Sequence, residues 1–225
     1  MKPIAGGAAL AFLLIAGLAQ AAEPPASYGD AVRWYERAAA SGSATAQFLL
    51  GRMLEEGTNR RHDPAAAARW YRKAAEQGHR LAQFSLGLMY YQGRGVAQDA
   101  AEAARWYGTA AAGGLPEAQF NLGYLYECSI GVAHDDTKAA DWYGKAAGQG
   151  LARAQLNLGL LLAPPANGTP RDAVGAWVWL SLAAANGAAG AATARDDLAA
   201  RMSPEDLAAA RARLAAHGRD NATRR

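Results

Sequence analysis

Apolar residues recur along much of the chain in steps of three and four, the spacing that places them on one face of an α-helix. In the clearest example they are Ala82, Leu86, Met89 and Tyr90 in one segment, and Ala103, Trp106, Tyr107 and Ala110 in the next. Gly93 and Gly95 interrupt the pattern between the two segments, and Asp99 is placed to cap the second one. The pattern therefore predicts two helices, over 82–92 and 100–112.

The same unit recurs with a period of 36 residues. A Trp-Tyr pair stands at 34–35, 70–71, 106–107 and 142–143, and a degenerate copy, Trp179-Leu180, follows after 37 residues. Asp63, Asp99 and Asp135 share the capping position in three successive units, and Asp172 lies close to it in the fourth. One helix pair cannot bury its apolar face alone, so neighbouring pairs must stack. The sequence thus predicts an all-α fold, an α-solenoid of stacked antiparallel helix pairs that forms a right-handed superhelix of 36-residue repeats.

Glycine also recurs inside the first helix of each unit, at Gly51, Gly87, Gly123 and Gly159. Glycine in a helix interior costs about 1 kcal/mol relative to alanine. Its retention at one repeat position predicts that neighbouring helix backbones approach closely there. The Trp-Tyr pairs are expected to fill the larger gaps of the core rather than to form a cofactor site.

The N-terminal segment has the pattern of a secretory signal peptide. Lys2 precedes an apolar run from Ile4 to Leu18, and Ala19-Gln20-Ala21 fits a small-x-small cleavage site. The run is shorter than the roughly 20 residues that span a bilayer. We expect cleavage after Ala21, no stable membrane anchor afterwards, and a periplasmic or secreted protein.

The rest of the chain divides into four parts by pattern. Residues 22–29 are predicted to be a flexible leader and residues 30–201 the solenoid, whose first element is an unpaired second helix over 30–41. Residues 202–217 are predicted to form a C-terminal capping helix that begins at Ser203-Pro204, and residues 218–225 a basic tail.

Composition narrows the chemistry. The 225 residues include 23 Lys and Arg against 20 Asp and Glu, a net charge of +3, which argues against nucleic-acid binding. The single cysteine, Cys128, excludes an intramolecular disulfide and a cysteine-based zinc site. A free cysteine behaves as a small hydrophobe, so burial of Cys128 is favoured over availability for an intermolecular bond.

No constellation of residues predicts catalysis. The serines do not stand in a nucleophile-elbow pattern. His62-Asp63 and His134-Asp135 occupy the same loop position, but two repeats separate them by roughly 20 Å, too far to share a metal ion. We therefore predict no catalytic residue, no cofactor and no metal site.

The repeating motif, Ala-x-x-x-Leu-Gly-x-x-Tyr-x-x-Gly-x-Gly-Val-x-x-Asp followed by Trp-Tyr-x-x-Ala-Ala-x-x-Gly, resembles the SLR family (Sel-one-like repeats), relatives of the tetratricopeptide repeats. The resemblance covers Tyr28 to Arg201. It implies a scaffold or adaptor that binds protein partners, in bacteria often in envelope signalling, assembly or host contact. A cysteine-rich branch of the family is linked to β-lactam-like compounds, and a chain with one cysteine departs from that branch.

In related solenoids the first helix of each pair lines the concave face. Positions two before, one after and four after the central glycine are then predicted to face the groove. The predicted partner-binding residues are Arg52, Glu55, Ser85, Tyr91, Asn121, Tyr124, Glu127 and Asn157. The two tyrosines and Asn121 are expected to anchor a protein or peptide partner, and the charged residues to set its orientation.

Three alternatives stay open. In the first, the predicted groove face is a mixed solvent surface that meets no partner. In the second, the chain is an envelope hydrolase or small-molecule binder. In the third, it is a packing module whose concave face is apolar and occupied. The sequence leaves the oligomeric state and the partner's identity undetermined.

Overall fold

The computed structural model describes residues 28–57, 62–164 and 172–222, with side chains described between 33 and 216. All regular elements in these ranges are α-helices. They are α2 (Tyr28–Ala40), α3 (Ala44–Glu56), α4 (Pro64–Glu76), α5 (Arg80–Gln92), α6 (Ala100–Ala112), α7 (Pro116–Glu127), α8 (Asp136–Gly148), α9 (Ala152–Leu162), α10 (Ala173–Ala185), α11 (Ala191–Ala199) and α12 (Pro204–Ala222). The predicted signal peptide and residues 22–27 of the predicted leader lie outside the described residues.

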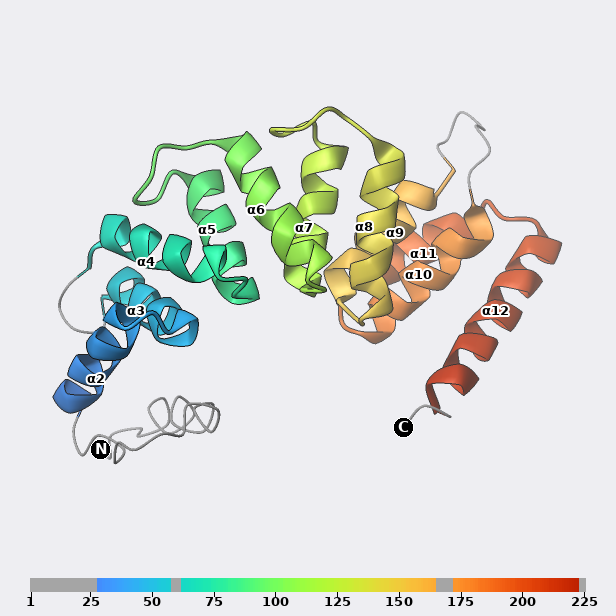
Figure 1. The fold of residues 1–225 in the computed structure, drawn as a ribbon. Helices are drawn as coiled ribbons and strands as arrows, with labels where there is room; N and C mark the ends of the chain where they lie inside the picture. The colour runs from blue at the N-terminus through green and yellow to red at the C-terminus, as the bar shows by residue number, and fades with distance from the viewer. Residues whose placement is uncertain (1–27, 58–61, 165–171, 223–225) are drawn as a thin grey trace, which may run out of the picture.

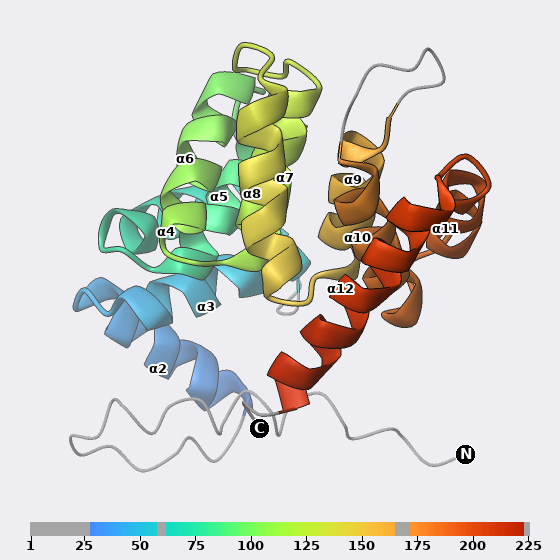
Figure 2. The same cartoon turned by 90° about the vertical axis from the view of Figure 1, so that its right-hand side faces the viewer.

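Successive helices pack as pairs, and each pair packs on the next, which confirms the predicted α-solenoid. The pairs are α3–α4, α5–α6, α7–α8 and α9–α10. They follow one another in an arc from the blue α2 to the red α12 (Figure 1). The helix α12 runs across the C-terminal end of the stack (Figure 2), where it packs against α10 and buries Ala210. We call α5–α6 the central pair, and α3–α4 and α7–α8 the flanking pairs.

The aspartates predicted as helix caps do begin the second helices. In α4, α6, α8 and α10, the carboxylate of the preceding aspartate accepts a hydrogen bond from a backbone N–H three residues ahead, at 2.7–3.0 Å. The first helix of the central pair begins two residues earlier than predicted, at Arg80. Its start is fixed by His79, whose Nδ1 accepts the backbone N–H of Ala82 at 3.2 Å.

The recurring mid-helix glycines pack mainly against a side chain of the second helix in the same pair. A Cβ atom at each glycine would lie 2.7–2.8 Å from that side chain, closer than real contacts allow. The pairs of residues are Gly51 with Tyr71, Gly87 with Tyr107, Gly123 with Tyr143, and Gly159 with Leu180. The predicted close approach of backbones is therefore refined: a carbonyl oxygen lies at 3.1–3.4 Å, but the ring or leucine side chain is nearer.

Burial divides the Trp-Tyr pairs. The tyrosines Tyr71, Tyr107 and Tyr143 are fully buried, as predicted for core residues. Trp106 is also buried, whereas Trp70 and Trp142 are half-buried at the edge of the core.

A buried glutamine near the start of each first helix joins neighbouring pairs, a feature that the repeat pattern alone did not reveal. Its Nε2 donates at 3.1 Å to a carbonyl oxygen at the end of the preceding second helix. The four bonds run from Gln47 to Ala39, Gln83 to Ala75, Gln119 to Ala111, and Gln155 to Ala147. A polar residue repeated every 36 positions beside the alanine column was the signal for it.

Two features of the structure differ from what the sequence predicted. The capping helix begins as predicted, with the Ser203 hydroxyl accepting the Asp206 N–H at 3.0 Å, but it continues to Ala222 rather than ending at residue 217. Cys128 is exposed rather than buried, and it is the C-cap residue that follows α7. Within the described ranges, every helix is too short or too polar to cross a membrane.

Candidate partner-binding groove

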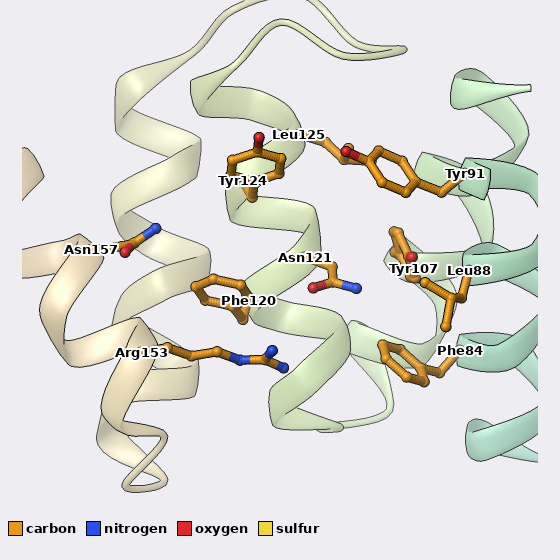
Figure 3. A pocket seen from close by; sticks show the side chains of 10 residues that line it. All are labelled: Phe84, Leu88, Tyr91, Tyr107, Phe120, Asn121, Tyr124, Leu125, Arg153 and Asn157. Carbon is orange, nitrogen blue, oxygen red and sulfur yellow. The ribbon is translucent and has the colours of Figure 1, made fainter. Parts of the chain in front are cut away.

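The first helices of three successive pairs enclose a hollow of about 440 Å³. Its lining residues are Phe84, Leu88 and Tyr91 from α5, Phe120, Asn121, Tyr124 and Leu125 from α7, Arg153 and Asn157 from α9, and Tyr107 from α6 (Figure 3). We call this hollow the partner groove. Nine of the ten residues come from first helices, the face that the sequence predicted to meet a partner.

The groove brings together four of the eight predicted site residues: Tyr91, Asn121, Tyr124 and Asn157. Tyr124 is 38% exposed, so part of its ring is available to a partner. The other four do not line the groove. Among these, Arg52 is exposed on α3 and forms an ion pair with Glu56 at 2.5 Å, and Ser85 is half-buried on α5.

The two predicted acidic residues are engaged inside the protein. Glu55 accepts a hydrogen bond from the Tyr71 hydroxyl at 2.7 Å and also forms an ion pair with Arg94 at 2.7 Å. In the other flanking pair, Glu127 accepts from the Tyr143 hydroxyl at 2.6 Å. Burial, together with these carboxylates, raises the pKa of both tyrosines far above the usual range, so both hydroxyls act as neutral donors.

The central pair lacks this arrangement. Tyr91 stands at the position of Glu55 and Glu127, sixteen residues before the buried tyrosine of its pair. Tyr107 is 1% exposed, and its hydroxyl makes no hydrogen bond of good geometry with any described residue. Burial raises its pKa to about 12, while the nearby Asn121 amide acts in the opposite direction. A buried donor left unpaired costs roughly 1–3 kcal/mol.

The Asn121 position has a clear counterpart in the next pair. There, Asn157 occupies the same repeat position and its Nδ2 donates to the Tyr143 hydroxyl at 3.2 Å. The hydroxyl of Tyr143 is thus held between an amide that donates to it and a carboxylate that accepts from it. Around the hydroxyl of Tyr107 an amide is at hand, but the accepting carboxylate is missing.

Sequence reasoning missed much of the apolar wall and its only charged residue. Phe84 lies against Tyr107, with ring centroids 5.7 Å apart, and the guanidinium of Arg153 lies 4.5 Å from the ring centre of Phe120. A phenylalanine column with a 36-residue period was the signal for the first, and the position one helical turn before Asn157 was the signal for the second.

The histidines form no metal site in the part of the chain that the structure describes, where no three His, Cys, Asp or Glu side chains are grouped to hold an ion. His134 instead fixes its own loop. Its Nδ1 lies 2.9 Å from the carbonyl oxygen of Glu127, and its Nε2 lies 3.3 Å from a carboxylate oxygen of Asp136.

Comparison with known proteins agrees with this architecture. The family model for the Sel1 repeat matches residues 10–43, 44–79, 80–115, 116–151 and 152–187, and the last four matches each begin at or near the first helix of a pair. A comparison with curated proteins gave no match.

Two solved structures are similar in sequence as well as in fold. A Sel1 repeat protein from Oxalobacter formigenes is 33% identical, with 76% of this chain and 70% of that one covered and a TM-score of 0.70. A protective antigen of uropathogenic Escherichia coli with an SLR fold is 31% identical, with 84% of this chain but only 48% of that one covered and a TM-score of 0.50. The chain belongs to the Sel1 repeat family, whose members are generally protein-interaction scaffolds.

Proposed function

We propose that the chain is an exported, non-catalytic adaptor that binds a protein or peptide partner in the partner groove, in bacterial envelope signalling, assembly or host contact. The groove itself carries the proposal, because it joins apolar walls to an exposed tyrosine, two amides and an arginine. Tyrosine and arginine are enriched among residues that dominate binding energy. Such a mixture suits a partner side chain that is apolar in part and polar at its end.

The chemistry of the lining residues supports binding rather than turnover. None of the ten is Ser, Cys, His, Asp or Glu, the residue types that supply most nucleophiles and general bases. A reaction in this groove would have to proceed without such a group.

A pair of substitutions tests the groove directly. A partner captured from the envelope fraction is purified, and its affinity is measured for the native chain and for the Tyr91→Ala/Tyr124→Ala variant. We expect a loss of at least about 30-fold in affinity, equivalent to roughly 2 kcal/mol, in a variant that still unfolds cooperatively; its melting temperature falls moderately because the half-buried Tyr91 ring also packs against the core. The matched control is Leu81→Ala, which removes a large side chain that is 46% exposed outside the groove. Equal affinity of the native chain and the tyrosine variant would place the partner elsewhere.

Export needs a separate test, because residues 10–21 belong both to the predicted signal peptide and to the first match of the family model. The full chain is produced in a bacterial host, and the mass and N-terminus of the protein in the periplasm and medium are determined. Export with cleavage after Ala21 gives a mature chain that begins at Ala22. Full-length protein confined to the cytoplasm would remove export from the proposal.

The size of the groove favours a second candidate function, small-molecule binding. About 440 Å³ lies in the range of ligand pockets, 300–1,000 Å³. This candidate would be supported if a small compound protected the chain against thermal unfolding and the Tyr91→Ala/Tyr124→Ala variant abolished that protection.

A further inference from the structure

We infer that the partner groove receives an acidic side chain from an extended segment of a protein partner, and that its carboxylate accepts a hydrogen bond from Tyr107. This inference rests on the proposed function and names the chemistry of the partner. The incoming carboxylate takes the role that Glu55 and Glu127 have in the flanking pairs.

The flanking pairs act as two internal reference sites. In each of them a buried tyrosine hydroxyl donates to a glutamate carboxylate, at 2.6–2.7 Å. The central pair keeps the buried tyrosine and the glycine beneath its ring, but it has Tyr91 where the glutamate stands. Compared with the flanking pairs, the central pair lacks a negatively charged acceptor beside Tyr107.

The Tyr107 side chain contributes to the floor of the groove, and its hydroxyl is shielded from solvent in the free protein, so the incoming carboxylate reaches it when a neighbouring lining side chain moves aside. Among the described residues, three buried side-chain atoms lack a hydrogen-bond partner: the Tyr107 hydroxyl oxygen and the indole nitrogens of Trp106 and Trp177. Of these three residues, Tyr107 alone lines the groove. In Figure 3 the side chain of Asn121 points toward Tyr107, while Tyr91 and Tyr124 lie near the same end of the groove on different helices. The amide of Asn121 offers a second donor to a bound carboxylate.

The charge of the groove matches an anion. Arg153 is the one charged residue of its lining, and no salt bridge between described residues involves it. Without an acid in the lining, its guanidinium attracts negative charge to the hollow. The apolar surfaces of Phe84, Leu88 and Phe120 are suited to an apolar side chain next to the acid, so a peptide segment fits better than an isolated anion.

A peptide library provides the probe. Eight-residue peptides with random flanks carry a fixed central Glu, Asp, Gln or Asn, and are selected on the immobilised native chain. The best acidic peptide, labelled with fluorescein, is then compared by fluorescence anisotropy with the same peptide in which the acid is replaced by its isosteric amide. We expect the acidic peptide to bind at least about 10-fold more tightly, and the preference to shrink at high salt.

Two variants locate the carboxylate. Tyr107→Phe removes the donor, and Tyr91→Glu supplies an internal acceptor like those of the flanking pairs. Both are expected to reduce the preference for acid over amide to about twofold or less. Tyr91→Glu is also expected to raise the melting temperature, a change that damage to the fold does not produce. The matched control is Tyr71→Phe, which removes a buried hydroxyl outside the groove and should keep the full preference.

The outcomes separate this inference from the proposed function. An unchanged preference for acid in Tyr107→Phe overturns the inference, as does equal selection of acidic and amide peptides. In that second case, a partner whose affinity still depends on Tyr91 and Tyr124 leaves the adaptor function standing. The compound 3-phenylpropionate serves as a free carboxylate. If it binds as tightly as the best peptide, the ligand is a small acid, and the inference that a segment of a protein partner occupies the groove is wrong.

Discussion

The central pair α5–α6 and its two neighbours share a backbone plan but differ in how they satisfy buried polar groups. All three have an aspartate cap, a buried glutamine and a mid-helix glycine under a tyrosine ring. The flanking pairs add a glutamate that accepts from the tyrosine hydroxyl, whereas the central pair has Tyr91 at that position.

A second difference lies at the end of α6. In the flanking pairs, Gln77 and Gln149 donate to the buried glutamine of their own pair at 2.7 and 2.8 Å. The central pair has Gly113 there, and its carbonyl oxygen accepts instead from Arg80 at 2.8 Å. The comparison teaches that the central pair keeps the shared cap, glutamine and glycine positions but lacks two side-chain hydrogen bonds that join the helices of each flanking pair.

The largest expected effect concerns the contact between the mid-helix glycine and the buried tyrosine ring, which all three pairs share. At Gly123 a Cβ would lie 2.8 Å from the Tyr143 ring, so Gly123→Ala should lower the free energy of unfolding by about 2–3 kcal/mol through overpacking. Gly87→Ala should cost about as much in the central pair. Urea unfolding measures both, and Gly108→Ala is the control, because its nearest neighbour is 4.0 Å away and the helix gains up to about 1 kcal/mol. Similar curves for all three variants would show that the rings yield to the added methyl group.

Removal of the tyrosine hydroxyls should separate the central pair from its neighbours. Tyr143→Phe leaves the Glu127 carboxylate without its donor, so we expect a loss of about 2 kcal/mol. Tyr107→Phe removes a buried hydroxyl without a partner and should leave the free energy of unfolding unchanged or slightly higher. The two variants are compared by urea unfolding at pH 7. Equal losses would mean that the Tyr107 hydroxyl has a partner in solution.

The buried glutamines offer a smaller contrast. Gln119→Ala removes one hydrogen bond to Ala111 and one from Gln149, whereas Gln83→Ala removes the bond to Ala75 but has only Gly113 at the second position. We expect Gln119→Ala to be the more destabilising by about 1 kcal/mol, the net value of one hydrogen bond. Thermal unfolding of the two variants tests this, and the reverse order would contradict the role given to Gln149.

The smallest expected effect is a pH dependence confined to the start of the central pair. Burial lowers the pKa of His79 below its usual value near 6.5, so the unfolded chain takes up the proton more readily than the folded one. The contribution of His79 is therefore complete above about pH 6.5 and is lost as the pH falls below that value. Serine already caps α3 at Ser43, so His79→Ser should keep the cap of α5. The variant should also flatten the dependence of stability on pH between pH 7.5 and 5.5. An unchanged slope would assign it to other groups.

Much of the fold follows from local sequence signals. The 36-residue period, the aspartate caps and the glycine that ends the first helix of the central pair are properties of short segments, and the structure reproduces them to within a few residues. The errors have local causes as well. Burial was expected for Cys128 from its residue type, but the residue is exposed at the C-cap position that follows α7.

The groove was predictable only in part. The ladder of repeat positions found Tyr91, Asn121, Tyr124 and Asn157, because equivalent positions of stacked first helices face the same side. It did not separate them from Glu55 and Glu127, whose carboxylates occupy the same ladder but reach inward to a tyrosine. Whether a side chain at these positions turns inward depends on which residue the second helix of the pair places opposite it. The repeat positions of the first helix do not contain that information.

The sequence by itself determined the α-solenoid and the places where its helices begin, because capping and amphipathic spacing act within about one repeat. Only the tertiary structure decided that Tyr107, buried and counted as a core residue, contributes to the floor of a groove between three helix pairs. The same holds for Arg153, which lies over Phe120 of the preceding repeat. The physical reason is that a groove arises where side chains of residues about 30 positions apart converge, and their packing sets which polar atoms stay unpaired.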